Sequence, residues 1–208
     1  MNIVFDFGAV LFDWQPARLA AQHFPERAAT PAQARQLARD LFGHADWQGF
    51  DCGTVSLDAV VTRTARRLDL PAARLHDALA PIGEELAPIA CNVELLAGLR
   101  ERRDRQADIK LYFLSNMPEP FARALEQRHD FLQWFDGGIF SGDVKLGKPD
   151  PVIFKLLASR YGMASADNTL FIDDSLVNVR AAGALGWQTI HCEAPERLRD
   201  QLKGKTGL

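Results

Sequence analysis

The chain has 208 residues, 47% of them hydrophobic and 25% charged, which is typical of a soluble globular protein. That length supports one hydrophobic core, or a core domain that carries a smaller insert. The net charge of −3 and the pI near 6.0 argue against nucleic acid or an anionic membrane surface as a partner.

The chain opens on a short apolar run that predicts a buried strand, and only helical patterns follow it as far as Pro88. Thr30 and Pro31 place a cap residue before a proline at the first helical position, and Ser56 is placed to cap another helix. Because no strand pattern occurs there, we predict an all-helical insert over residues 16–88. Two helices are predicted within it, over residues 32–42 and 57–68, and a third helical segment begins with residues 74–79.

Beyond the insert, short apolar runs alternate with helical patterns. The runs are too short for helices and are apolar at every position, which is typical of strands buried on both faces of a parallel sheet. The predicted strands cover residues 3–5, 111–114, 138–140, 170–172 and 189–192. The predicted helices cover residues 93–103, capped by Asn92, then 122–128, 151–161 and 177–185, and a short amphipathic helix with a frayed end after Pro195.

Repeated strand–helix–strand units with right-handed crossovers predict an α/β fold, a Rossmann-like doubly wound parallel sheet. Residues 1–15 and 89–208 form the predicted core domain. Residues 16–88 form a small helical cap domain over the carboxyl edge of the sheet.

Polar residues follow the predicted strands, at the edge where open α/β sheets bind ligands. Asp6 ends the first apolar run, where a carboxylate is costly unless a metal or a phosphoryl group compensates it. An Asx-turn that closes the strand is the alternative. Ser115 and Asn116 follow the second strand, and their hydroxyl and carboxamide suit a phosphate oxygen, although the pair is also an ordinary helix cap.

Two further motifs complete the set. Lys148 lies before a helix and can supply a point charge to a phosphoryl oxygen, although most lysines are surface residues. Asp173 and Asp174 follow the fourth strand, with Asn178 shortly after them. Adjacent carboxylates repel each other unless a cation separates them, and oxygen ligands without a His or Cys cluster indicate Mg²⁺ rather than zinc. A purely structural role for the acid pair is the alternative.

The order of these motifs resembles that of the haloacid dehalogenase-like hydrolases. The resemblance covers essentially the whole chain, and the helical insert resembles the first type of cap in that superfamily. Residues 5–10, FDFGAV, resemble more narrowly the branch that contains bacterial glucose-1-phosphate phosphatases. The resemblance implies a phosphoric monoester hydrolase that acts on a small phosphorylated metabolite, with sugar phosphates among the candidates.

The resemblance also implies roles for individual residues. Asp6 is the expected nucleophile, which forms an aspartyl-phosphate that water then hydrolyses. Lys148 neutralises charge on Asp6 and on the transferring group, which Ser115 and Asn116 hold.

A magnesium ion is implied as the cofactor. Its expected ligands are Asp6, the backbone carbonyl of Gly8, Asp174 and, directly or through a water, Asp173. Asn178 is expected to orient the acid pair.

The position of Gly8 departs from the pattern, because most phosphatases of this superfamily carry there a second Asp that acts as general acid and base. Losing such a group ordinarily costs roughly 10²–10⁴ in rate. The narrower branch also has Gly there, and a good leaving group such as an anomeric phosphate needs less acid help. Asp13 is one candidate for the missing acid, with helix capping as its alternative role. His44, Asp46 and Asp51 in the insert are others, each with an ordinary structural explanation.

Other functions stay open from sequence. A 2-haloacid dehalogenase of the same superfamily would attack carbon with Asp6, but those enzymes need no metal and lack an acid pair such as Asp173-Asp174. A phosphate-ester binding or regulatory module without turnover would also fit the loss of the acid at Gly8. A phosphomutase fits less well, because transfer back to the sugar needs the same missing group.

The remaining patterns concern the localisation of the protein, its cysteines and its aromatic residues. No apolar run approaches the roughly 18 residues that span a bilayer, and the chain opens without a signal-peptide pattern, so we expect a cytoplasmic monomer or homodimer. The widely spaced Cys52, Cys91 and Cys192 indicate neither a disulfide framework nor a zinc site. Aromatic residues that follow the first strand or lie in the insert are candidates to line a substrate pocket, with a role in the hydrophobic core as the favoured alternative: Trp14, Phe42, Trp47 and Phe50.

Overall fold

The computed structural model describes residues 1–163 and 165–206. Its strands are β1 (Asn2–Phe5), β2 (Lys110–Ser115), β3 (Gly137–Phe140), β4 (Thr169–Asp173) and β5 (Gln188–His191). Its α-helices are α1 (Pro16–His23), α2 (Pro31–Phe42), α3 (Ala45–Asp51), α4 (Leu57–Leu68), α5 (Ala72–Leu79), α6 (Ile82–Glu85), α7 (Ala90–Gln106), α8 (Glu119–Arg128), α9 (Ser141–Val144), α10 (Pro151–Arg160), α11 (Leu176–Ala184) and α12 (Leu198–Thr206). Two 3-10 helices, η1 (Asp130–Trp134) and η2 (Pro195–Arg197), complete the order.

The five strands form one parallel sheet in the order β3-β2-β1-β4-β5. The predicted α/β fold is confirmed, and each predicted strand is present with its ends shifted by no more than one residue. Because β1 lies between β2 and β4, the residues that follow these three strands meet at the centre of the carboxyl edge.

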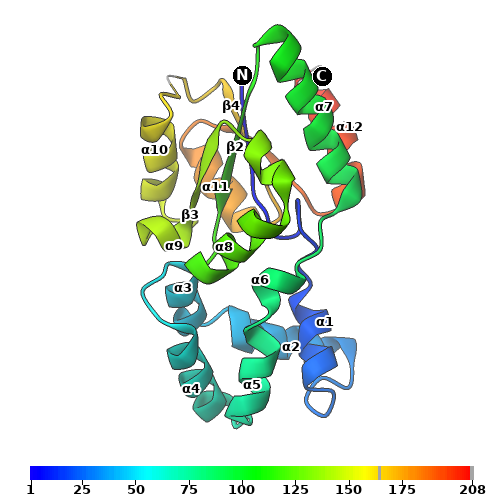
Figure 1. Cartoon of the computed structure of the whole chain (residues 1–208), viewed down its shortest axis with the longest axis vertical. Helices are drawn as coiled ribbons and strands as arrows, with labels where there is room; N and C mark the ends of the chain where they lie inside the picture. The colour runs from blue at the N-terminus through cyan, green and yellow to red at the C-terminus, as the bar shows by residue number, and fades with distance from the viewer. Residues whose placement is uncertain (164, 207–208) are drawn as a thin grey trace.

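Helices cover both faces of the sheet, which explains why its strands are apolar at every position. Ile3 and Phe5 pack into one hydrophobic cluster with α7, α8 and α12, whereas Val4 points to the other cluster with α10 and α11. Figure 1 shows α7 and α12 together on one side of the sheet, with α10 and α11 on the other. Side chains that alternate between two buried faces are the expected result of the strand period of two.

The helices α1 to α6 lie below the carboxyl edge of the sheet in the view of Figure 1. We call residues 16–88 the helical insert. Thr30 caps α2 in a capping box with Gln33, and Ser56 accepts a bond from the Ala59 amide at the start of α4. The two helix starts predicted from these residues are therefore confirmed.

One predicted helix start is wrong. Asn92 was expected to cap a helix over residues 93–103, but α7 begins at Ala90, and Asn92 lies inside its first turn. Its buried side chain instead donates a 2.7 Å hydrogen bond to the carbonyl of Val10. The bond ties α7 to the segment after β1, a long-range contact that no local pattern indicates.

The C-terminal amphipathic helix is present as α12, with Leu198 and Leu202 buried. Its predicted frayed end falls on residues 207–208, which lie outside the described residues. Within the described part of the chain, no helix combines the length and the apolar character that crossing a membrane requires.

Candidate active site

Three adjacent strands bring the predicted catalytic residues together. Asp6 directly follows β1, Ser115 ends β2 and Asp173 ends β4. Lys148 reaches the same point from the segment between α9 and α10. All four are buried, with relative exposures of 7% or less.

Lys148 lies between two carboxylates. Its Nζ is 2.8 Å from Oδ1 of Asp6 and 2.6 Å from Oδ2 of Asp173. Burial by itself would lower the pKa of Lys148, but the two carboxylates outweigh that effect and raise it. Lys148 therefore stays charged and fixed at the position where a phosphoryl group would reach Asp6.

Asp6 and Asp174 hold protons more tightly than exposed carboxyls do. Burial raises the pKa of Asp6 to about 7, Lys148 opposes the rise, and the charges of Asp173 and Asp174 add to it. Burial and the charge of Asp173 raise the pKa of Asp174 to about 6. The site thus carries more negative charge than one lysine neutralises, and a cation bound there would displace protons.

Asp6, Asp173 and Asp174 lie close enough together to share one divalent cation. One carboxylate oxygen from each of Asp6, Asp173 and Asp174 lies within 4.8 Å of the others. Mg²⁺ prefers oxygen ligands, and these carboxylates together carry more negative charge than Lys148 neutralises. Unlike the other two, Asp174 is exposed, so that it offers an accessible oxygen at the mouth of the site.

Asp173 is the most constrained of these acids. Its Oδ1 accepts a 2.8 Å bond from the Ser175 amide, its Oδ2 accepts from Lys148, and Asn178 Nδ2 lies 3.1 Å from both oxygens. Both oxygens of this fully buried carboxylate thus already accept hydrogen bonds. We therefore assign to Asp173 mainly the role of holding Lys148 in place. Asn178 lies where the sequence placed it, beside the acid pair.

Asn116 has a different partner from the one expected. Its Nδ2 donates to the Lys148 carbonyl and its Oδ1 accepts from the Lys148 amide, both at 2.8 Å. The carboxamide is therefore occupied by backbone and fixes the lysine, rather than being directed at a phosphate. Ser115, by contrast, lines the cavity beside Asp6 and Lys148, and its role as a phosphate ligand stays a prediction.

A cavity of about 380 Å³ lies above these residues, between the sheet and the helical insert. Its polar lining is Asp6, Gly8, Asp51, Ser115, Asn116, Lys148, Asp174, Ser175 and Asn178. Its apolar lining is Trp14, Phe42, Trp47, Ile82, Leu86, Met117, Pro118 and Phe121. Of the four aromatic residues considered from sequence, Trp14, Phe42 and Trp47 thus line the cavity, and Phe50 belongs to the hydrophobic core.

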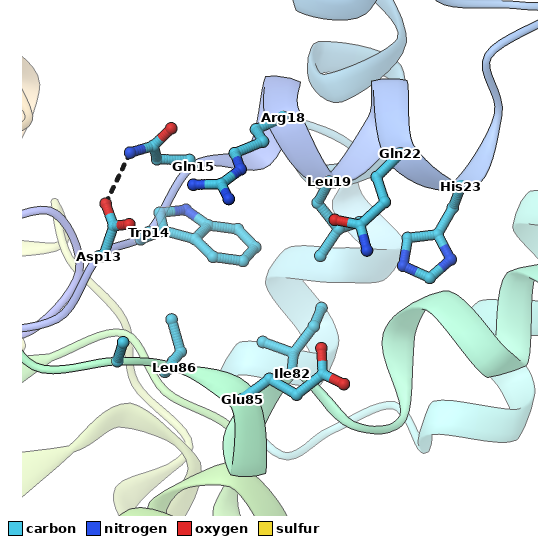
Figure 2. A pocket seen from close by; sticks show the side chains of 11 residues that line it. Asp13, Trp14, Gln15, Arg18, Leu19, Gln22, His23, Ile82, Glu85 and Leu86 are labelled. Atoms are coloured by element: carbon cyan, nitrogen blue, oxygen red, sulfur yellow. Dashed lines mark hydrogen bonds between the residues drawn. The ribbon is translucent and has the colours of Figure 1, made fainter.

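Asp13 lies outside this cavity. It is exposed and accepts a 2.7 Å hydrogen bond from Gln15. Figure 2 shows both side chains beside a neighbouring crevice, to which Trp14 also contributes. Asp13 is absent from the described lining of the cavity that contains Asp6, so the structure adds no support to the prediction that Asp13 acts as the acid.

Asp51, at the end of α3, does line the cavity. Burial raises its pKa well above the usual range, and the nearby charge of Asp6 raises it further, against the opposing effect of Lys148. His44 and Asp46 pair with each other 3.1 Å apart at the start of the same helix and are absent from the described lining of the cavity. Sequence alone could not separate these three insert residues, because none lies in a local motif.

Comparison with known proteins identifies the chain's family. The model of the haloacid dehalogenase-like hydrolases matches residues 2–186. The chain belongs to the haloacid dehalogenase-like hydrolases. The predicted superfamily is thereby confirmed, and the phosphatases among the relatives confirm the predicted enzyme class, a phosphoric monoester hydrolase.

Individual relatives are more distant. A sesquiterpene phosphatase of Aspergillus oryzae is 26% identical over 90% of this chain and 87% of its own length. A phosphorylated carbohydrates phosphatase of Thermotoga maritima is 26% identical over 91% of this chain and 83% of its own. A family enzyme of Bacteroides thetaiotaomicron, solved with magnesium and inorganic phosphate, shares the fold with a TM-score of 0.67 at 20% identity, over 91% of this chain and 92% of that one.

Proposed function

We propose that this haloacid dehalogenase-like hydrolase is a magnesium-dependent phosphatase that hydrolyses small phosphate monoesters through a phosphorylated Asp6. The class, a phosphoric monoester hydrolase, follows from the family together with the phosphatases among its relatives. The observation that carries the rest is the buried Asp6 carboxylate at the floor of a cavity, paired with Lys148 and close to two further acids.

The residues of the chain support each part of this reaction. A carboxylate oxygen of Asp6 attacks phosphorus, and the bond to the leaving oxygen breaks as the bond to Asp6 forms. Lys148, held by Asp173 and by Asn116, neutralises charge on the equatorial oxygens. The Ser115 hydroxyl lies in the cavity lining, within the same group of residues, and can donate to a phosphoryl oxygen.

The acids fit a bound Mg²⁺. Asp6, the carbonyl of Gly8 and the accessible Asp174 would hold it, with Asp173 acting through Lys148 or through a water. When bound, the ion supplies positive charge to Asp6 and to the phosphoryl oxygens. Positioning and charge neutralisation are the main requirements of phosphoryl transfer, so that one such ion and one lysine suffice.

The helical insert serves as the cap of this site in our proposal. Its residues Phe42, Trp47 and Asp51 line the same cavity as Asp6. A cap that closes on the substrate excludes water from the phosphoryl group. We place the boundaries of this cap at residues 16 and 88.

The two alternatives remain distinguishable. A dehalogenase does not need the accessible Asp174 beside Asp173, so that the charge excess at the site argues against that function. A binding module without turnover would keep the metal site but release no phosphate.

The test is phosphate release from 4-nitrophenyl phosphate and a panel of aliphatic and sugar phosphates, with Mg²⁺ or with EDTA. We expect turnover with Mg²⁺, loss of turnover to background in EDTA, and recovery when Mg²⁺ is returned. Ligand binding without phosphate release on any ester would favour the binding module. Chloride release from a 2-chloro acid in EDTA would favour the dehalogenase.

A further inference from the structure

The cavity above Asp6 has a polar part and an apolar part. Its polar residues gather at the strand ends, where the phosphoryl group is placed, whereas the insert and the nearby loops contribute mainly apolar side chains. Of the insert residues that line it, Phe42, Trp47, Ile82 and Leu86 are apolar, and Asp51 is the exception among the described residues.

Aromatic rings form a continuous wall on this apolar side. The rings of Trp14 and Phe42 meet edge to face at 5.0 Å, and those of Phe42 and Trp47 at 4.7 Å. Trp47 and Phe121 continue the series at 6.4 Å, from the insert to α8 of the core. Rings packed on one another in this way are preorganised, so that the wall exists before a substrate enters.

We infer that the leaving group of the substrate is an apolar alcohol, with no hydroxyl besides the one that carries the phosphate, rather than a sugar. This inference rests on the proposed phosphatase activity. A hexose would bury several hydroxyls against rings and aliphatic chains, and sites without partners for such groups reject them. An apolar alcohol instead removes its own surface and that of the wall from water.

Two esters of nearly equal shape test this inference. Cyclohexylmethyl phosphate has the six-membered ring and the primary phosphate of glucose 6-phosphate, but none of its hydroxyls. We expect its kcat/KM to be at least ~100-fold higher. Exchanging Phe42 for glutamine should raise KM for this ester with little change in kcat, and Phe42→Leu, the matched apolar control, should stay near wild type.

Hydrolysis of glucose 6-phosphate at an equal or higher kcat/KM would overturn the inference. Cleavage of 4-nitrophenyl phosphate but of neither test ester would do the same. Because the aryl phosphate reports turnover independently, its own failure to react would count against the proposed function instead.

A different observation concerns the acid that Gly8 does not supply. Gly8 has no side chain to donate a proton, and a Cβ built on it would make ordinary van der Waals contact, at 3.6 Å, with Cβ and Cδ1 of Trp14. The proton donor of the reaction must therefore come from elsewhere in the cavity lining. Asp51, an insert residue, lines the same cavity.

The position of Asp51 is fixed by bonds between the insert and the core. The Ser141 hydroxyl donates to the Asp51 carbonyl at 2.5 Å and accepts from the Met117 amide at 2.8 Å. Lys145 donates to the carbonyl of Gly53 at 2.8 Å. These bonds hold the end of α3 against the carboxyl edge of the sheet.

We propose that Asp51 is the general acid and base of the reaction. Its carboxyl gives a proton to the leaving oxygen as the phosphorus–oxygen bond breaks and that oxygen keeps the bonding pair. The resulting carboxylate then takes a proton from the water whose oxygen attacks phosphorus, while the bond from phosphorus to Asp6 breaks and inorganic phosphate forms. Asp51 is thereby protonated again.

The charges that face Asp51 are consistent with this role. Burial and the carboxylate of Asp6 favour its protonated form, whereas Lys148 and a hydrogen bond from Trp47 oppose it. The neighbouring thiol of Cys52 has a raised pKa, through burial and through Asp51, and stays neutral. A protonated carboxyl in the lining of the cavity that contains Asp6 is the form that a general acid requires.

The test compares Asp51→Asn with Asp13→Asn, a matched change outside the cavity. We expect Asp51→Asn to lower kcat/KM for an alkyl phosphate by about 10²–10³, and that for 2,4-dinitrophenyl phosphate by less than ~10-fold, because that leaving group needs no proton. We also expect the activity of the wild type to fall at high pH, where Asp51 loses its proton, and this fall should be absent from Asp51→Asn. A loss equal for both esters, or no loss, would overturn the proposal, and Asp13→Asn should match the wild type throughout.

Discussion

Exchanging Asp6 for asparagine is expected to lower phosphate release by at least ~10⁴-fold, because the variant keeps the shape of the site but lacks the nucleophile. The fold should survive this change. Burial raises the pKa of Asp6 to about 7, so that its ionised form is held at a cost, and a neutral amide removes that cost. Asp173 still pairs with Lys148 in the variant.

The measurement is kcat with Mg²⁺ on 4-nitrophenyl phosphate, together with the melting temperature of both proteins without metal. We expect activity to fall while the melting temperature stays level or rises. Residual activity within a factor of about ten of wild type would contradict the assignment of Asp6. A collapse of the melting temperature would instead show that Asp6 is needed for folding.

Lys148→Met is expected to damage both activity and stability. Loss of the charge on the transferring group should lower kcat by about 10³. The fully buried Asp173 also loses its cation, and breaking one side of a buried pair typically costs about 3–5 kcal/mol. Urea unfolding without metal, at pH 8, measures this second effect.

The stability loss should depend on pH. The pKa of Asp6 in the folded protein, about 7, lies above its ordinary value of 3.8. The stabilisation linked to its proton is therefore complete below about pH 4 and disappears as the pH rises through about 7. At pH 5.5 Asp6 is protonated, so that in Lys148→Met it adds no buried negative charge to that of Asp173. The loss of stability in Lys148→Met should therefore be smaller at pH 5.5 than at pH 8.

Lys145→Met is the matched control for the stability effect. Lys145 is exposed and its described bond is to the carbonyl of Gly53, so that its removal should cost less than about 1 kcal/mol. A stability loss in Lys148→Met no larger than in this control would contradict the account of the buried ion pair.

Much of the fold could be predicted because the sheet is buried on both faces. Such strands are continuous apolar runs, and their ends carry polar residues at the positions of Asp6, Ser115 and Asp173. The helix starts at Thr30 and Ser56 follow from local capping chemistry. These signals lie within a few residues of the feature that they predict.

The wrong helix start at Asn92 and the unexpected partner of Asn116 have a common physical cause, which is contact between distant segments. Asn92 looked like a helix cap, but its partner is Val10, far back in the chain. Asn116 looked like a phosphate ligand, but the backbone of Lys148 occupies its side chain. In both cases the local pattern offered a plausible role, and tertiary structure supplied a different partner.

The insert residues that line the cavity were the hardest to predict from the sequence. Phe42 and Trp47 are ordinary core residues by composition, and only their packing against Trp14 shows them as a wall. Asp51 stood beside His44 and Asp46 as one of three equal candidates until the cavity lining distinguished it. Where a helix lies over a sheet is decided by long-range packing.

The most direct test of the central claim is to find the phosphoryl group on Asp6 itself. The enzyme is mixed with Mg²⁺ and excess 4-nitrophenyl phosphate, quenched in acid during turnover, digested with trypsin and examined by mass spectrometry. The account predicts one phosphoryl group on the peptide that ends at Arg18, placed by fragmentation on Asp6 and absent from Asp6→Asn. Turnover with no phosphoryl group on this peptide, or with one on another residue, would contradict it.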